Sequence, residues 1–116
     1  MVKDSVDGGA VVEGRVYIDE GAEIRGDAVI REPVYIGRNT LVESGAYIGP
    51  YTSIGDGCYI SGVELEDSVV MKDVTIKDVN ARIVGSVIGA HAVIERKRSF
   101  PSGIKLVVGE RVKIYV

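Results

Sequence analysis

The stretch IGPYTSIGDGCYI, residues 48–60, places isoleucine at three positions six residues apart, Ile48, Ile54 and Ile60. An α-helix repeats every 3.6 residues and a strand every two, so neither element alone has this period. The spacing continues in both directions as a row of large aliphatic residues, which we call the anchors. They are Val12, Ile18, Ile24, Ile30, Ile36, Val42, Ile48, Ile54, Ile60, Leu65, Val70, Ile76, Ile83, Ile88 and Ile94.

A second row of residues, two positions before each anchor, is small or β-branched throughout. It reads Ala10, Val16, Ala22, Ala28, Val34, Thr40, Ala46, Thr52, Cys58, Val63, Ser68, Val74, Ala81, Ser86 and Ala92. Residues two apart in a strand share a face, so each short strand directs one large and one small side chain inward. Three such strands make one triangular turn of the chain. The fifteen anchors therefore predict an all-β protein, a single-stranded parallel β-helix of about five triangular coils stacked at about 4.8 Å.

Glycine follows several anchors directly, at Gly37, Gly49, Gly55 and Gly89. These positions lie near the predicted corners, where we expect positive φ to be required. No GxxxxGK[ST] pattern occurs, and the glycines do not join a strand to a helix, so the sequence gives no sign of a nucleotide loop.

Length and charge restrict the classes of function. The chain has 116 residues, 14 Lys plus Arg and 17 Asp plus Glu, which indicates one domain without the basic surface that nucleic acids require. We therefore expect no nucleic-acid partner. No run approaches the roughly 18 apolar residues of a membrane helix, and the first ten residues do not resemble a signal peptide, so we expect no membrane partner and a cytoplasmic location. The one cysteine, Cys58, is expected to be a packed core thiol.

The repeat ends at Ile94 and divides the chain into three parts. Residues 1–94 are the predicted β-helix, 95–103 (ERKRSFPSG) a polar loop, and 104–116 a C-terminal strand that caps an open edge or exchanges with a neighbouring subunit. The loop carries Arg96, Lys97 and Arg98, which either receive a phosphate or a nucleotide-bearing partner domain or are simply solvated.

Few residues suggest chemistry. His91 is the only histidine and is the one candidate catalytic residue, as a general base, although a solvated corner residue is the simpler interpretation. A three-histidine zinc site is impossible within one subunit. Carboxylate pairs such as Glu64 with Glu66 are interpreted as solvated charges. The sequence therefore assigns no cofactor and no metal site.

One of the three outward faces differs from the others. The residues just before its anchors are Tyr17, Tyr35, Ser53, Val69 and Val87, and after the first coil it carries no charge, whereas the other two faces carry several. A flat uncharged face is typical of an interface. We therefore predict an interface formed by Tyr17, Tyr35, Val69, Met71 and Val87.

The repeat resembles the hexapeptide-repeat family, which implies a left-handed helix. The stretches GPYTSIG, ELEDSVVM at 64–71, GSVIGAHAVI at 85–94 and LVVGERVKIYV at 106–116 resemble the C-terminal domain of long-form glucose-1-phosphate thymidylyltransferases. The resemblance implies a non-catalytic assembly domain of a sugar-1-phosphate nucleotidyltransferase, forming a homo-oligomer, with a trimer expected. That family carries nucleotidyl transfer in an N-terminal domain whose G-x-G-T-R-L-type loop and metal-binding carboxylates are missing here. The alternative is a small hexapeptide acyltransferase that uses acyl-CoA, with His91 as base.

Overall fold

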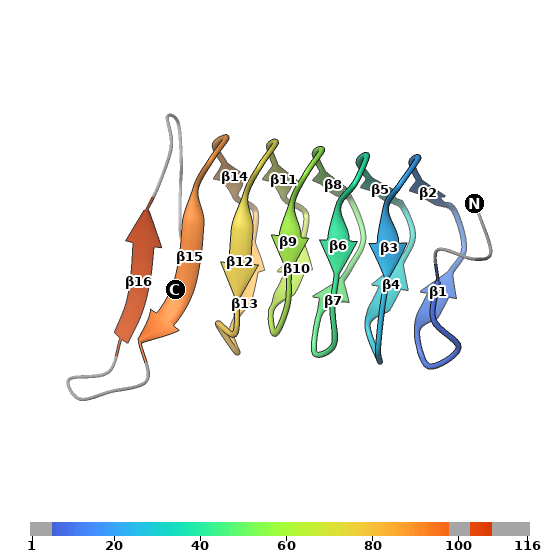
Figure 1. Cartoon of the computed structure of the whole chain (residues 1–116), viewed down its shortest axis with the longest axis horizontal. Helices are drawn as coiled ribbons and strands as arrows, with labels where there is room; N and C mark the ends of the chain where they lie inside the picture. Colours follow the sequence, from blue (N-terminus) through green and yellow to red (C-terminus); the bar gives the residue numbers. More distant parts are fainter. Residues whose placement is uncertain (1–5, 98–102, 108–116) are drawn as a thin grey trace.

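The computed structural model describes residues 6–97 and 103–107, and all regular elements of this part are strands. They form three sheets, one on each side of a triangular prism (Figure 1). The β1 sheet contains β1 (Val11–Glu13), β4 (Val29–Arg31), β7 (Tyr47–Ile48), β10 (Glu64–Glu66) and β13 (Arg82–Val84). The β2 sheet contains β2 (Val16–Ile18), β5 (Val34–Ile36), β8 (Thr52–Ile54), β11 (Val69–Val70) and β14 (Val87–Ile88). The β3 sheet contains β3 (Glu23–Ile24), β6 (Leu41–Val42), β9 (Tyr59–Ile60), β12 (Thr75–Lys77), β15 (Val93–Lys97) and β16 (Gly103–Val107).

Successive coils pair in parallel with the register that the anchors predict. On the β2 sheet, Tyr17 lies beside Tyr35, Tyr35 beside Ser53, Ser53 beside Val69 and Val69 beside Val87. Each coil thus presents the corresponding residue to the next coil. The prediction of an all-β parallel β-helix of about five coils is confirmed, and the left-handed sense stays an expectation of the resemblance.

The core is a column of anchors. Every anchor from Ile18 to Ile94 is at most 4% exposed, while Val12, in the open first coil, is only partly buried. The small residues fill the corners beside them, and Cys58 is 2% exposed. Each fully buried Ile or Val contributes about 1.5–3 kcal/mol, so this column supplies most of the driving force for folding.

The seven-residue step between Ile76 and Ile83 is accommodated by an additional core residue. Val79 is completely buried, whereas Ala81, predicted as the small core residue of this coil, is only half-buried. The Arg96 side chain donates a hydrogen bond from Nε to the Val79 carbonyl oxygen, 2.6 Å away. A hydrogen bond thus joins Val79, the residue that interrupts the repeat, to the next coil.

The prediction of positive φ at the glycines after the anchors is wrong. Positive φ occurs at other corner positions, including a row three residues after the β2-sheet anchors: Gly21, Asn39, Gly57, Asp73 and His91. Gly37 is needed for close approach instead, because a Cβ there would lie 2.5 Å from the Gly55 carbonyl carbon. At Gly55 a Cβ would lie 2.9 Å from the Met71 carbonyl carbon. These glycines let neighbouring coils approach.

The last strand reverses direction. β16 pairs antiparallel with β15, with Val107 beside Val93 and Gly103 beside Lys97, so it covers the outer edge of the β3 sheet. The predicted 95–103 loop is therefore too long at both ends, because residues 95–97 and 103 belong to strands. Residues 108–116, which complete the predicted tail, lie outside the described residues. No helix long and apolar enough to cross a membrane is found in the described part of the chain.

Candidate interaction surface

The outward surface of the β2 sheet gathers exposed apolar side chains. We call it the uncharged face and define it by Tyr17, Tyr35, Ser53, Val69, Met71 and Val87. Tyr17 is 60% exposed, Val69 and Met71 are 46% exposed, and Val87 is 42% exposed. Tyr35 and Ser53, which are half-buried, lie between Tyr17 and Val69 in the row. Exposed apolar side chains that gather on one face are typical of a surface that meets a partner. The sequence-predicted interface residues thus lie together on one sheet.

Two tyrosines of this face are held in fixed positions. The Tyr17 and Tyr35 rings stack with centroids 5.6 Å apart and planes 14° from parallel. The Tyr35 hydroxyl donates to Asp19 Oδ2 at 2.8 Å, which raises the pKa of Tyr35. The pKa of Asp19 is lowered, first by the hydrogen bond from the Glu20 backbone N–H and then by that from Tyr35. Rigid aromatic rings lose little entropy on contact with a partner, which favours their use in binding.

A shallow groove of about 670 Å³ follows one edge of the uncharged face over the first three coils. Three tyrosines, Tyr17, Tyr35 and Tyr51, line it together with Arg15 and Pro33. Tyr51 is 72% exposed and occupies a corner with φ of 61°. Sequence reasoning missed Tyr51, because it lies at a corner, outside the alternation of inward and outward residues.

The outward surfaces of the other two sheets carry ion pairs. On the β1 sheet, Arg31 Nε lies 3.3 Å from Glu13 Oε2 and Arg82 Nη2 lies 2.7 Å from Glu66 Oε2. On the β3 sheet, Arg25 pairs with Glu23 and Glu43. Exposed pairs add little to stability, but taking them out of water is costly. The uncharged face is therefore the side that a partner can cover at least cost.

His91 lies at a corner of the prism. Its side chain is 69% exposed, its backbone φ is 66°, and Nδ1 lies 3.6 Å from Asp73 Oδ2. It lines neither the groove on the uncharged face nor the second hollow, on the β1 sheet. These are the surroundings of a solvated corner residue, because both the imidazole and the Asp73 carboxylate beside it are largely exposed.

Two of the other candidate groups, Arg96 and Cys58, have structural roles. Arg96 is half-buried and bonded to Val79, whereas the Lys97 side chain and Arg98 lie outside the described residues. Burial raises the pKa of the Cys58 thiol, whose Sγ donates to the Met71 carbonyl oxygen at 3.0 Å. Glu66 is paired with Arg82, while Glu64 is exposed. Among the described residues, no three His, Cys, Asp or Glu side chains gather as a metal site would need.

Comparison with known proteins identifies the family. A search of curated proteins finds no match to this chain. The family model of the GMPPB C-terminal domain matches residues 31–115, which include eleven of the fifteen anchors and most of the tail. The chain therefore belongs to the GMPPB C-terminal domain family, a sugar nucleotidyltransferase C-terminal β-helix domain.

Proposed function

We propose that this β-helix is a non-catalytic assembly domain that joins copies of a sugar-1-phosphate nucleotidyltransferase through the uncharged face. The observation that carries the proposal is the contrast between the three faces. Beyond Asp19 in the first coil, the face with Tyr17, Val69 and Val87 carries no charged side chain, and the other two faces carry ion pairs. Burying an apolar face of this kind is favourable, at about 25 cal/mol per Å² of area removed from water.

The parent enzyme is inferred to resemble glucose-1-phosphate thymidylyltransferase and to work in nucleotide-sugar biosynthesis in the cytoplasm. The stretches GPYTSIG and ELEDSVVM support this specificity. Nucleotidyl transfer needs a phosphate-binding loop and metal-binding carboxylates, and this sequence shows the motif of neither. Catalysis therefore belongs to a separate N-terminal domain, which is a second expected partner of the β-helix.

The acyltransferase alternative gives the opposite result in an activity assay. Given a nucleoside triphosphate, a sugar 1-phosphate and Mg²⁺, the chain alone should release no pyrophosphate, and given acetyl-CoA and an amino sugar it should release no free CoA. Acetyl transfer that is lost in His91→Ala would overturn the proposal and assign His91 as the base.

Assembly is tested by placing charge on the uncharged face. Tyr35→Glu combined with Val69→Glu should dissociate the oligomer, because each carboxylate would be buried without a partner. The matched control is Leu41→Glu combined with Tyr59→Glu, which changes half-buried outward residues of the β3 sheet and should leave the oligomer intact. Light scattering gives the mass of each variant. Dissociation of the control pair but not of the test pair would show that another face is the interface.

A further inference from the structure

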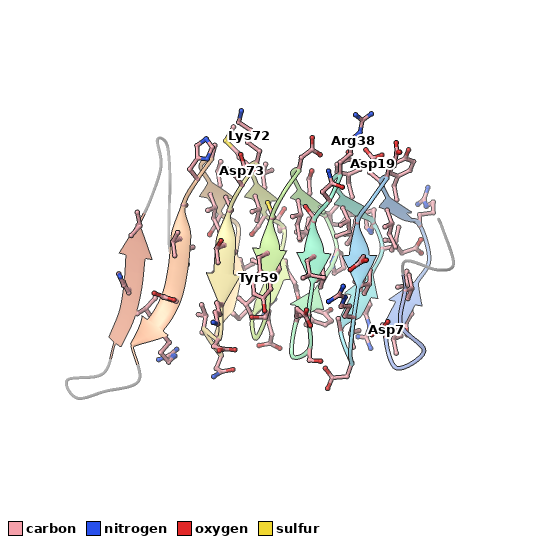
Figure 2. The ribbon with its side chains drawn as sticks, viewed as in Figure 1. Asp7, Asp19, Arg38, Tyr59, Lys72 and Asp73 are labelled. Atoms are coloured by element: carbon pink, nitrogen blue, oxygen red, sulfur yellow. The ribbon has the colours of Figure 1, made fainter. Side chains whose placement is uncertain are left out.

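The two edges of the uncharged face carry ordered rows of corner residues. The first edge row lies two residues after each β2-sheet anchor and contains Glu20, Arg38, Asp56, Lys72 and Ala90. Backbone hydrogen bonds from the next coil reach the carbonyl oxygens of Glu20, Arg38, Asp56 and Lys72, which shows that these residues stack one coil apart. All four are exposed, and their charges alternate along the prism. Figure 2 shows Arg38 and Lys72 on the same edge.

The second edge row lies just before each small core residue of the β2 sheet. From the first coil to the fifth it contains Arg15, Pro33, Tyr51, Asp67 and Gly85. Its two charges are opposite in sign and three coils apart. The aromatic and proline residues of the middle coils lie between them and line the groove.

From these rows we infer that the uncharged face binds a second copy of itself in antiparallel orientation, coil 1 against coil 4 and coil 2 against coil 3. This inference rests on the proposed assembly function and specifies its geometry. The two-fold axis would run along the strand direction, so each edge row of one copy would meet the same row of the other copy. Such an interface is isologous, the commonest kind in homo-oligomers.

Within the first edge row this register matches every charge with an opposite one. Glu20 would meet the partner's Lys72, and Arg38 would meet the partner's Asp56, each contact occurring twice by symmetry. A shift by one coil, about 4.8 Å, would oppose Glu20 to Asp56 and Arg38 to Arg38. A shift by two coils or more leaves at most half of the contacts between opposite charges. The row therefore selects one register and penalises its neighbours.

The second edge independently fits the same register. Arg15 in coil 1 would meet the partner's Asp67 in coil 4, and Pro33 would meet the partner's Tyr51. The Tyr51 ring, which is 72% exposed, would then enter the groove of the other copy. Between the edges, Tyr17 would pack against the partner's Val69 and Met71. Asp19, the carboxylate beside Tyr17, would approach the partner's Lys72.

Alternating charge also suits a single chain, because neighbouring coils place these side chains close together. Arg38 has such a contact, with its Nε 3.8 Å from Asp19 Oδ2. Stacking within one chain does not relate Arg15 to Asp67 or Glu20 to Lys72, because each pair is three coils, about 14 Å, apart. The antiparallel pair explains why Arg15 and Asp67 carry opposite charges three coils apart, and why Glu20 and Lys72 do the same.

The test uses charge reversal at Glu20 and Lys72. Glu20→Lys alone and Lys72→Glu alone should each weaken self-association about tenfold, because each variant opposes like charges at two symmetric contacts. Mixing the two variants should restore wild-type affinity, since one contact then pairs Lys at 20 with Glu at 72 and the other keeps the native pair of Glu20 with Lys72. The matched control is Lys77→Glu, an exposed lysine of the β3 sheet, which should have no effect. Sedimentation equilibrium measures the affinities.

Cross-linking gives a second readout that does not depend on those affinities. Glu20→Cys mixed with Lys72→Cys should form a disulfide between positions 20 and 72, and neither variant alone should cross-link. Native Cys58 is buried and provides the background. A 20-to-20 disulfide, or a mixture no tighter than the single variants, would overturn the antiparallel register and favour the parallel trimer that the resemblance implies. A monomeric wild-type chain would instead overturn the assembly proposal itself.

Discussion

At Ile54 one side chain shows what sets the register of the whole fold. Ile54 is completely buried and lies between Ile36 and Val70 of the neighbouring coils. Ile54→Asp would place a carboxylate in this column with no partner, at a cost of several kcal/mol, and should prevent folding. The matched control is Thr75→Asp, at a half-exposed outward position of β12. Circular dichroism should show loss of β structure in the first variant only. A soluble, fully folded Ile54→Asp protein would contradict the register.

The Cys58 thiol makes the folded state less stable at alkaline pH. Burial raises the pKa of its thiol above the value in the unfolded chain, so the folded state holds the proton more tightly. The contribution of this thiol to the free energy of unfolding is fully present below the pKa of the unfolded chain, about 8.5. It is lost as pH rises from there through the pKa of the folded state, by at most about 1.4 kcal/mol per pH unit. Urea unfolding of the wild type should show this fall. Cys58→Ser, which does not ionise in this range, should show a flatter profile, and identical profiles would refute the assignment.

Among the elements, the strands were predictable because one physical requirement acts on each of them. A coil of three strands must bury one anchor and one small residue per strand, and this requirement leaves a visible period of six. Val79 was not predictable, because an irregular coil satisfies the same requirement with an additional residue. The role of Arg96 was equally hidden. The Val79 carbonyl to which it donates belongs to that irregular coil.

The glycines show a different limit of sequence reasoning. Gly37 and Gly55 were correctly expected near corners, but for the wrong reason, because the sequence does not show how closely the next coil approaches. On the candidate surface, alternation along each strand predicted Tyr17, Tyr35, Val69, Met71 and Val87 on one face. It did not predict Tyr51 or the groove, since corner residues belong to no strand.

The edge strand β16 has a testable role. It pairs along β15 over five residues, and Ile104 packs against the core. A chain that ends after Lys97 would expose the free N–H and C=O groups of β15, which can pair with another chain. This truncated protein should associate into large particles, seen as growing light scattering with time. A chain that ends after Val107 keeps β16 and should not. If light scattering grew equally in the two shortened chains, β16 would not be the element that covers the edge of β15.

At the scale of the whole molecule, the residues that fold the prism are separate from those that we propose for assembly. The interior column stabilises the coils, and the three outward surfaces are free to differ in charge. Two of them keep ion pairs in water, while the uncharged face combines stacked tyrosines, valines and a groove. Under the proposed function, such a domain serves the enzyme through a specific contact between subunits rather than through pocket chemistry.

The mass of the native chain in solution tests this account most directly. One chain has a mass of 12.4 kDa. Sedimentation equilibrium of the wild-type protein over a range of concentrations should give a multiple of this mass, and twice this mass if the antiparallel pair is correct. A mass of 12.4 kDa at every concentration would contradict the central claim that the uncharged face joins copies of this chain.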